Sequence, residues 1–330
     1  METQDWRPTA PWTHLRRRAE ILQQIRAFFV ERSVLEVDTP SLSSATVTDL
    51  HLKSLRCQLD VPKGDAEPGA QVFYLQTSPE FAMKRLLAAG SGPIFQICKS
   101  FRDDESGRRH NPEFTMLEWY RPGFDHHRLM DEMDALLDRI LGCGAAERLT
   151  YGEAFERHLA VDPHRATRRE LADAAARAGI DFASSGEDSG LDRDDWLHLL
   201  LSHEVEPHLG ADGPTFLYDY PASQAALARI RAGDPPVAER FEVYWRGIEL
   251  ANGFHELTDA EEQRRRFEQD LASRKKAGLE QPPMDERLLA ALNAGLPDCA
   301  GVALGVDRLV MAALNASHID EVVAFPVSRA

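Results

Sequence analysis

The chain has 330 residues, of which 43% are hydrophobic and 28% charged, and its formal net charge is -16. This length allows one large domain or two ordinary ones, and the composition is that of a globular protein. The acidic excess argues against a broad nucleic-acid surface, because neutralising phosphates requires clustered Lys and Arg. No apolar run approaches the roughly 20 residues that cross a bilayer, and residues 1–10 lack a signal-peptide pattern, so we expect a cytoplasmic protein without membrane contact.

The cysteines and histidines give little sign of a metal site. The cysteines are scattered without a CxxC pair, and they are Cys57, Cys98, Cys143 and Cys299. This spacing predicts reduced core thiols, and neither a disulfide framework nor a zinc site. His126 and His127 follow a predicted strand, and we expect both to be solvated loop residues.

The first third of the chain alternates helical and strand patterns. Apolar residues recur near helical spacing from Leu15 to Val30, which predicts an amphipathic helix. Val34–Pro40 alternates apolar and polar residues and ends at a proline, as is typical of an edge or interface strand. Further elements are predicted as strands at Gln71–Gln76, Pro93–Phe101 and Phe114–Tyr120 and as a helix at Pro79–Ala89.

The rest of the chain predicts the fold class. Arg102–Glu113 reads as a long hairpin loop, and strands joined locally favour antiparallel pairing. The later elements are expected as a mainly helical stretch at 129–209, strands at Thr215–Asp219 and Arg240–Leu250, and a charged helix at Asp259–Lys276. Because regular βαβ alternation is missing, we predict an α+β fold with helices flanking an antiparallel sheet.

A glycine-rich turn near the C-terminus is the first candidate for ligand binding. Gly301–Met311 combines glycines, which let backbone approach a flat ligand closely, with Arg308 one turn into a predicted helix. The planar guanidinium suits a phosphate or an aromatic ring. Taken alone, the segment is equally compatible with a packing turn between a strand and a helix.

A second candidate is the charged hairpin Phe101–Tyr120. Arg102, Arg109 and His110 would line a cationic pocket beside strands that carry Glu118 and Tyr120. The alternative is a solvated charged hairpin without a ligand.

A third candidate is Gly247–Leu257, in which Glu249 and Glu256 lie seven residues apart. With one irregularity near Gly253, both carboxylates could reach a shared cation, and carboxylates that share Mg²⁺ with substrate phosphates are usual for this hard ion. The alternative is a salt-bridged strand with a glycine bulge.

The fourth candidate is the predicted start of a helix. Ser78 is expected to cap it with Pro79 at the first helical position, and Glu80 could still point into a pocket.

Together these segments resemble the catalytic domain of the class II aminoacyl-tRNA synthetases, and the lysyl branch in particular. Val34–Pro40 is similar to motif 1, Phe101–Tyr120 to motif 2 and Gly301–Met311 to motif 3. The match to the lysyl branch is sharpened by three further segments, Thr77–Glu80, His110–Phe114 and Asn252–Leu257. The resemblance covers the chain from about Leu15 to the end.

The resemblance implies a domain organisation and partners. We expect a polar segment at 1–14 and a catalytic domain at 15–330 with a mainly helical insertion at about 129–209, without an anticodon-binding OB-fold. Without that OB-fold, and with an acidic chain, tRNA is a poor acceptor. The resemblance then points to stand-alone relatives that transfer a lysine-type residue to a lysine of elongation factor P. Motif 1 implies a homodimer.

The resemblance also implies an adenylate-forming site that uses ATP and Mg²⁺. Arg102 and Arg308 would be catalytic, holding the α-phosphate and the γ-phosphate. The residues implied for ATP are Arg102, Asp103, Asp104, His110, Asn111, Phe114, Glu249, Leu250, Gly305 and Arg308. Those implied for the lysine-type substrate are Ser78, Pro79, Glu80, Glu118, Tyr120, Asn252, Phe254 and Glu256. Glu249 and Glu256 would hold Mg²⁺.

Two positions depart from the family pattern. Asp104 stands where the lysyl branch has glutamate, and Ala303 stands where tRNA-charging enzymes have glycine. The extra methyl group of Ala303 would narrow the amino-acid pocket and favour β-lysine over α-lysine. The competing interpretations are a truncated enzyme that charges tRNA or a small acceptor, and a catalytically inactive regulatory paralogue.

Overall fold

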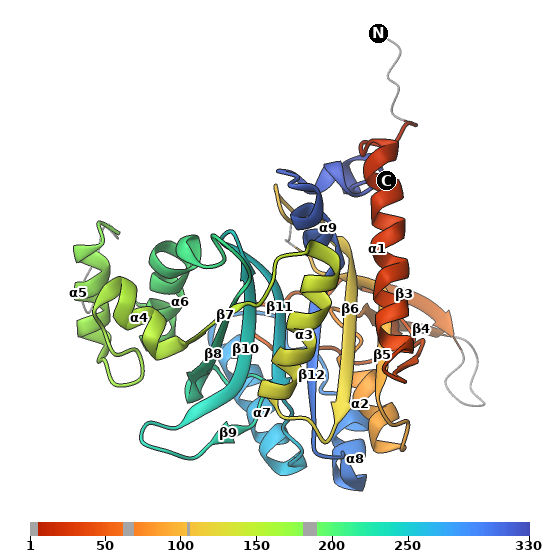
Figure 1. Cartoon of the computed structure of the whole chain (residues 1–330). Helices are drawn as coiled ribbons and strands as arrows, with labels where there is room; N and C mark the ends of the chain where they lie inside the picture. Colours follow the sequence, from red (N-terminus) through yellow and green to blue (C-terminus); the bar gives the residue numbers. More distant parts are fainter. Residues whose placement is uncertain (1–5, 62–68, 104–105, 181–189) are drawn as a thin grey trace. The chain divides into compact units, whose positions relative to one another are not determined.

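The computed structural model describes residues 6–61, 69–103, 106–180 and 190–330 (Figure 1). The chain divides into two compact units. Unit 1 comprises Met1–Gly123, Thr258–Cys299 and Ala303–Ala330, and unit 2 comprises Phe124–Leu257 with Ala300–Val302. Unit 1 is therefore built from both ends of the chain, and most of unit 2 is one continuous stretch between them.

Unit 1 opens with a long helix and contains two sheets. Its helices are α1 (Trp12–Val30), α2 (Glu80–Ala88), α7 (Ala260–Lys276), α8 (Glu286–Gly295) and α9 (Val306–Leu314), with short 3₁₀ turns η5 (Ile319–Glu321) and η6 (Val327–Arg329). One sheet has the order β1-β5-β6-β12, from β1 (Leu35–Glu36), β5 (Ile94–Phe101), β6 (Glu113–Pro122) and β12 (Cys299–Gly305). The other is antiparallel, in the order β2-β4-β3, from β2 (Leu42–Ser43), β4 (Gly69–Leu75) and β3 (Arg56–Val61). In the first sheet β1 runs parallel to β5, whereas β5 and β6 are antiparallel.

Aromatic side chains hold α1 against the sheet of unit 1. Phe29 is fully buried and stacks on Phe95 of β5, with ring centroids 4.6 Å apart. Its edge also meets Trp119 of β6 at 5.2 Å. Burying one such side chain contributes about 1.5–3 kcal/mol, so this cluster explains why the amphipathic pattern of α1 selects a face on β5 and β6.

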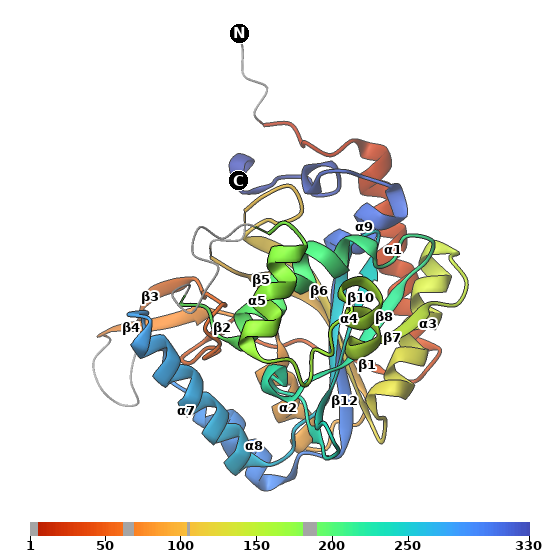
Figure 2. The same ribbon diagram turned by 90° about the vertical axis from the view of Figure 1, so that its left-hand side faces the viewer.

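On another side of unit 1, α7 and α8 lie beside each other (Figure 2). Phe81 of α2 meets Phe267 of α7 with ring centroids 5.8 Å apart. Asp259 caps α7 by accepting from two backbone N–H groups of the first turn, as an acidic cap does. These contacts fix α2, which carries part of the candidate site.

Unit 2 contains strands and a group of helices. Its strand order is β12-β11-β10-β8-β7, with β9 (Ile230–Arg231) paired to β10, from β11 (Ile248–His255), β10 (Val237–Trp245), β8 (Thr215–Pro221) and β7 (Glu147–Thr150). The β10 strand runs antiparallel to β11 and β8, and β7 runs parallel to β8. The helices are α3 (His126–Leu141), α4 (Tyr151–Leu159), α5 (Arg168–Arg177), α6 (Arg193–Leu200), the π-helix η2 (Leu201–Val205) and the 3₁₀ turns η3 (Glu206–His208) and η4 (Ala222–Gln224).

Local sequence signals start the helices of unit 2. Thr150 and Glu153 form a reciprocal capping box at α4, in which each side chain binds the backbone N–H of the other. The same arrangement begins α5 and α6. Behind the caps, Tyr151 and Phe155 of α4 stack at 4.6 Å within a buried apolar cluster. Within the described part of the expected helical stretch at 129–209, helices alternate with β7 and with short loops.

The α+β class with an antiparallel-dominated sheet is confirmed, but several predicted boundaries are wrong. The strand expected at Val34–Pro40 is reduced to β1, and the helix expected from Pro79 begins at Glu80. The strand expected at Arg240–Leu250 is a hairpin, because the chain turns at Arg246 and Gly247 with φ of 49° and 67°. A two-residue hairpin turn of type I′ needs positive φ angles at both central residues, and Arg gives no signal for one.

Burial corrects two further expectations. His126 is 1% exposed and begins α3, so it is not a solvated loop residue, whereas His127 is exposed. The four cysteines have free thiols, as expected, but only Cys299 is buried and the other three are partly exposed.

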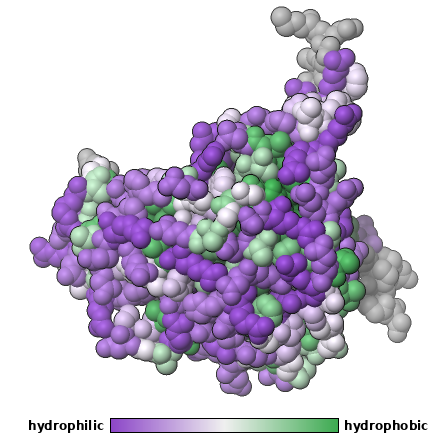
Figure 3. Space-filling view, in the orientation of Figure 1, coloured by the Kyte–Doolittle hydropathy of each residue, from purple (hydrophilic) through white to green (hydrophobic). Residues whose placement is uncertain are grey.

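The surface and helices agree with the composition. The face in Figure 3 is mostly hydrophilic with small apolar areas. Among the described residues, we find no helix with the length and apolarity needed to span a membrane.

Candidate active site

The charged hairpin of unit 1 is closed by its own backbone. Arg102 N–H donates to Pro112 O at 2.9 Å where β5 ends, and Gly107 and His110 pair with each other across the loop. Asp103 forms an ion pair with Lys53 at 2.7 Å. Asp104 lies outside the described residues. The described residues at the two ends of the loop are therefore held against each other.

Motifs 2 and 3 meet in unit 1. Arg308, in the first turn of α9, donates from Nη2 to Nε2 of His110. Arg109 lies near the same place, since burial first, and then the positive charges of Arg108 and Arg308, lower the pKa of its guanidinium. Partly exposed cations collected at a loop and a helix N-terminus form a surface suited to phosphate.

A neighbouring aromatic side chain completes this group. The guanidinium of Arg102 lies over the ring of Phe114, 5.1 Å from its centroid. Phe114 is partly exposed, so one face is available for stacking on a ligand ring. Gly305 precedes α9 with an ordinary φ of -73°, so its contribution would be the missing side chain and not unusual backbone freedom.

Asn111 has a structural role that its predicted ATP contact did not include. It is buried, its Oδ1 accepts from Val327 N at 2.9 Å, and its Nδ2 donates to Glu113 O at 2.6 Å. Ile319 N also donates to the backbone oxygen of Arg108 at 2.9 Å. The last residues of the chain therefore fasten the motif 2 loop.

Asp307 is a residue that the sequence interpretation missed. Its buried carboxylate binds Arg18 of α1 at 2.6 Å and accepts from Thr115 N of β6 at 2.8 Å. The residue next to Arg308 is thereby tied to two other elements, which positions the start of α9. An acidic residue beside a helix start is common, so its spacing alone carried no signal.

The predicted substrate residues on β6 form a buried hydrogen-bonded group. Glu118 is 1% exposed and accepts from Ser78 Oγ at 2.9 Å and from Tyr120 Oη at 2.6 Å. Burial, and then the negative charge of Glu118, raise the pKa of the nearby Cys98 thiol to about 12. A fixed carboxylate beside hydroxyls is suited to binding an ammonium group.

The predicted cap at α2 differs from the structure. Pro79 is the N-cap residue and not the first helical residue, although Ser78 Oγ accepts from Glu80 N at 3.0 Å. Glu80 is paired at 2.6 Å with Lys84, which lies one turn along α2 and is 1% exposed. The sequence interpretation missed this internal cation, although the spacing of four residues on a helix is its usual signal.

In unit 2 a β-bulge brings the third candidate segment onto one face. The register of β10 and β11 shifts at Leu250, because Val243 faces Ala251 while Tyr244 faces Glu249. The irregularity is therefore at Leu250 and not near Gly253 as predicted. The extra residue turns Glu249 to the face that also carries Asn252 and Phe254, since these lie opposite Glu242 and Arg240.

Gly253 has a packing role on the opposite face of β11. A Cβ atom there would lie 2.4 Å from the ring of Phe241 and 2.9 Å from Val302 Cβ. Only glycine fits this approach, which explains a feature that looked like a bulge in the sequence.

A buried ion pair organises the face that Glu249 joins. Arg240 and Glu242 of β10 are bonded to each other, and Arg240 Nε also donates to Asn252 Oδ1 at 3.2 Å. Tyr220 and Tyr244 donate to Oε2 of Glu242 at 2.6 and 2.5 Å. None of these four residues was predicted, because they converge only once the strands pair.

Carboxylates in unit 2 fit the chemistry of a hard divalent cation. Glu249 is partly exposed, and Glu256 is 1% exposed and pairs through its backbone with Ala228. Carboxylate oxygens are the ligands that Mg²⁺ prefers, so each of these side chains suits the ion. The two residues lie at opposite ends of an extended strand that rises about 3.3 Å per residue, roughly 20 Å apart, so the prediction that both reach one shared cation is wrong.

Comparisons with known proteins agree with these motifs. The chain matches the sequence profile of the family described as tRNA synthetases class II (D, K and N) over residues 4–329. This match covers nearly the whole chain.

The chain belongs to the class II tRNA synthetase family.

Curated members of this family resemble the chain over its full length. It is 58% identical over 330 residues to a Vibrio cholerae protein named elongation factor P–(R)-beta-lysine ligase, with all of both chains covered. It is 58% identical over 325 residues to the protein of the same name from Edwardsiella ictaluri, covering 98% of each. A third, from Klebsiella pneumoniae, is 56% identical over 329 residues, covering all of this chain and 99% of its own.

The predicted site residues form one group in unit 1 and another in unit 2. In unit 1 the structure brings Arg102 to Phe114, Arg308 to His110, and Ser78 and Tyr120 to Glu118. In unit 2 it brings Glu249, Asn252 and Phe254 to one face of β11. Residues that were named from sequence motifs are therefore in contact with each other, or lie on one face of a strand, within each unit.

Proposed function

We propose that this chain is an ATP-dependent ligase that activates a lysine-type amino acid, (R)-β-lysine, and transfers it to a lysine side chain of elongation factor P. The observation that best supports this proposal is the contact between motifs 2 and 3, in which Arg308 donates to His110 beside Arg109. The names of the full-length relatives supply the substrate and the acceptor.

The first step joins two anions. The substrate carboxylate attacks the α-phosphorus of ATP, forming an acyl-adenylate and releasing pyrophosphate. Fixed cations stabilise the charge that develops, so Arg102 is proposed to hold the α-phosphate and the carboxylate, and Arg308 the γ-phosphate. Phe114 would stack on the adenine. His110, Asn111 and Gly305 would border the nucleotide.

The side chain of the substrate needs anions in a buried place. An unpaired ammonium is costly to desolvate, and Glu118, held by Ser78 and Tyr120, provides a fixed partner. Glu80 is proposed to assist from α2, where Lys84 already balances part of its charge. In unit 2, Asn252, Phe254 and Glu256 are the residues proposed for the lysine-type substrate.

Mg²⁺ is proposed to accompany ATP, with Glu249 and Glu256 as two separate candidate ligands. When bound, it would neutralise charge on the phosphates of ATP. The residues of the chain orient the reactants, and no covalent enzyme intermediate is needed.

In the second step the amine of an acceptor lysine attacks the activated carbonyl. An amide bond forms, AMP leaves with the electrons of the broken bond, and the amine loses a proton. The net charge of -16 favours a basic protein surface over tRNA as the acceptor.

We also propose a homodimer formed through motif 1, and a cytoplasmic location. Large apolar side chains are exposed in and around this segment, with Val30 at 70%, Leu35 at 57% and Leu42 at 39%. Such side chains in one region of a surface are typical of an interface.

The test has two parts. Pyrophosphate exchange with (R)-β-lysine and α-lysine measures activation, and we expect the β isomer to be preferred. Labelled (R)-β-lysine is then offered with elongation factor P or with total tRNA. Label in the protein supports the proposal, label in tRNA alone rejects it, and no exchange with either isomer indicates an inactive paralogue.

A further inference from the structure

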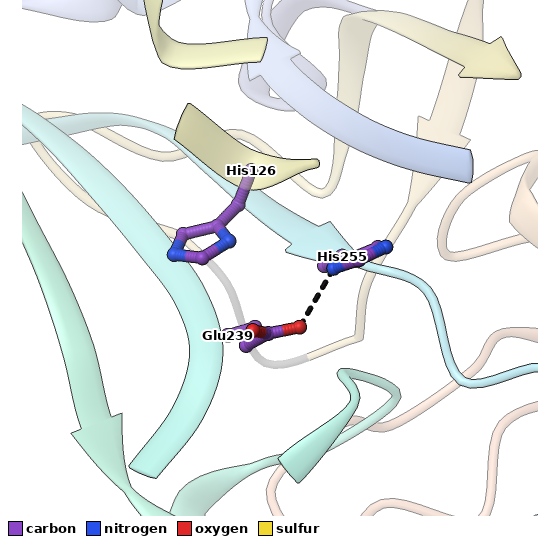
Figure 4. A group of neighbouring side chains, drawn as sticks. All are labelled: His126, Glu239 and His255. Carbon is purple, nitrogen blue, oxygen red and sulfur yellow. Dashed lines mark hydrogen bonds and ion pairs between the residues drawn. The ribbon is translucent and has the colours of Figure 1, made fainter. Parts of the chain in front are cut away.

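Unit 2 contains a cluster of ionisable side chains that the proposed reaction does not use. His126 begins α3, Glu239 lies on β10 and His255 ends β11, and one ligand atom from each lies within 4.8 Å of the others. Figure 4 shows the three side chains turned toward one another from these three elements. Two imidazoles and a carboxylate are a set that binds Zn²⁺.

His126 supplies the observation that points to a ligand. The residue is 1% exposed, and within the described part of the chain neither of its ring nitrogens has a hydrogen-bond partner. A buried polar group without a partner costs about 1–3 kcal/mol, so such groups are rare unless an ion or water satisfies them. A metal ion at this point would accept one ring nitrogen as a ligand.

In Glu239 and in the neighbouring Asp219, one carboxylate oxygen faces a histidine and the other faces Arg231, which suits a metal site. Glu239 directs Oε2 to Nδ1 of His255 at 2.6 Å, whereas its Oε1 lies 3.5 Å from Arg231. Asp219 directs Oδ1 toward Nε2 of His126 at 3.7 Å, and its Oδ2 binds Arg231 at 2.6 Å. Arg231 thus holds the far oxygens of both carboxylates while the near ones face the histidines.

Asp219 is placed to bind the ring nitrogen of His126 that a metal ion would leave unused. Metal-bound histidines usually donate their second ring nitrogen to a carboxylate, which fixes the ring and raises its basicity. Asp219 is placed for this role on one side of His126, with the other ring nitrogen left for the ion.

The backbone is irregular at the same place. The pairing of β10 with β8 shifts between Ala238 and Phe241, and Asp219 on β8 adopts a φ of 59°. A positive φ in a residue other than glycine costs of order 1 kcal/mol or more and tends to persist at functional sites. Both strands therefore leave regular pairing where Glu239 and Asp219 project.

We propose that His126, Glu239 and His255 bind a divalent transition-metal ion, Zn²⁺ by the chemistry of its ligands, with Asp219 orienting His126. Tetrahedral ligand atoms at about 2.1 Å from one ion lie about 3.4 Å apart, so the ligand atoms, which now lie within 4.8 Å of one another, need to shift by up to about 1.4 Å. Three protein ligands leave a fourth position for water. The ion would join α3 to β10 and β11 and stabilise unit 2.

The first measurement is metal content. The full chain is produced without a polyhistidine tag, dialysed against metal-free buffer and analysed by mass spectrometry of the elements. We expect about one Zn²⁺ per chain in wild type and a higher melting temperature after Zn²⁺ is added to chelator-treated protein.

Variants locate the ion. Glu239→Gln and His126→Gln should each abolish the zinc-dependent rise in melting temperature, and Asp219→Asn should weaken binding about 10–100-fold, as loss of an outer partner does. His203→Gln is the matched control, because this exposed histidine of unit 2 is hydrogen-bonded to Ser202 and to the backbone oxygen of Leu199 and lies outside the cluster.

Two results would overturn the proposal. Wild type could hold no more zinc than Glu239→Gln, or zinc could bind equally in every variant and so lie elsewhere. If His126→Gln does not fold, Glu239→Gln and Asp219→Asn still decide the question. Because metal content and melting are measured without turnover, their outcome is independent of the ligase activity.

Discussion

The two units hold their charged residues in different ways. In unit 1 the cations at motifs 2 and 3, including Arg109 and Arg308, are partly exposed at a loop and a helix start. In unit 2 Arg240 and Glu242 have side chains only 15% and 9% exposed, and two tyrosines hold the carboxylate. Partly exposed cations are accessible to a ligand, whereas a buried ion pair mainly maintains geometry. Mutations in the two units should therefore separate activity from stability.

The largest effect is expected from breaking the buried pair of unit 2. Arg240→Met leaves Glu242 buried without its guanidinium, which should lower the free energy of unfolding by about 3–5 kcal/mol. Urea denaturation measures this loss. The double variant with Glu242→Leu should recover much of it, since the uncompensated charge is then gone. A single-variant loss below about 1 kcal/mol would show that the pair is not a structural anchor.

The next effect concerns unit 1 and should leave stability intact. Arg308→Ala removes a cation proposed to stabilise developing phosphate charge, so kcat/KM for pyrophosphate exchange should fall about 10²–10³-fold. The free energy of unfolding should change by about 0.5 kcal/mol or less. Arg264→Ala is the matched control, because Arg264 forms an exposed ion pair with Glu286 and should alter neither quantity by much. An equal fall in both activity and stability would contradict the separation.

A smaller effect is expected where unit 1 does bury a charge. Tyr120→Phe removes a hydroxyl that donates to Glu118. Hydrogen bonds to charged groups contribute about 1.5–3 kcal/mol, so the KM for the lysine-type substrate should rise about 30-fold. Ser78→Ala tests the other donor to the same carboxylate. Unchanged KM values in both variants, measured by pyrophosphate exchange, would remove Glu118 from substrate binding.

The smallest effect concerns selectivity. Ala303 is a partly exposed residue of β12, in line with Gly301 and Gly305 on one face of the strand. Ala303→Gly should shift the preference between β-lysine and α-lysine toward the α isomer by about tenfold, the low end of what one methyl-sized group achieves. The ratio of kcat/KM for the two isomers checks this. An unchanged ratio would show that Ala303 does not select the isomer.

Local patterns were enough to predict most of the elements. The amphipathic spacing of α1, the antiparallel pair β5 and β6, and the acidic start of α7 are each encoded within about 30 residues. The hairpin of β10 and β11 was not predicted, because Arg246 in its turn has no turn preference and the single glycine at Gly247 does not by itself specify a hairpin.

In the candidate site, too, the residues within short motifs could be predicted and the long-range contacts that position them could not. Arg102, His110 and Arg308 could be named because two short motifs carry them. Their placement by Asp307 and Asn111 could not, since those contacts join residues about 190 and 216 positions apart. The cluster of His126, Glu239 and His255 likewise spans three separate elements, and no spacing rule would have found it.

The attachment of the C-terminal segment to the motif 2 loop has a consequence for the order of folding. Chains fold progressively as they are synthesised, N-terminal parts first. Because Val327 binds Asn111, and Thr9 N–H donates to Ala324 O at 2.9 Å, the loop and the N-terminal segment cannot be secured until the last residues have been made. The motif 2 loop therefore lacks these contacts while the 216 positions that separate Asn111 from Val327 are synthesised.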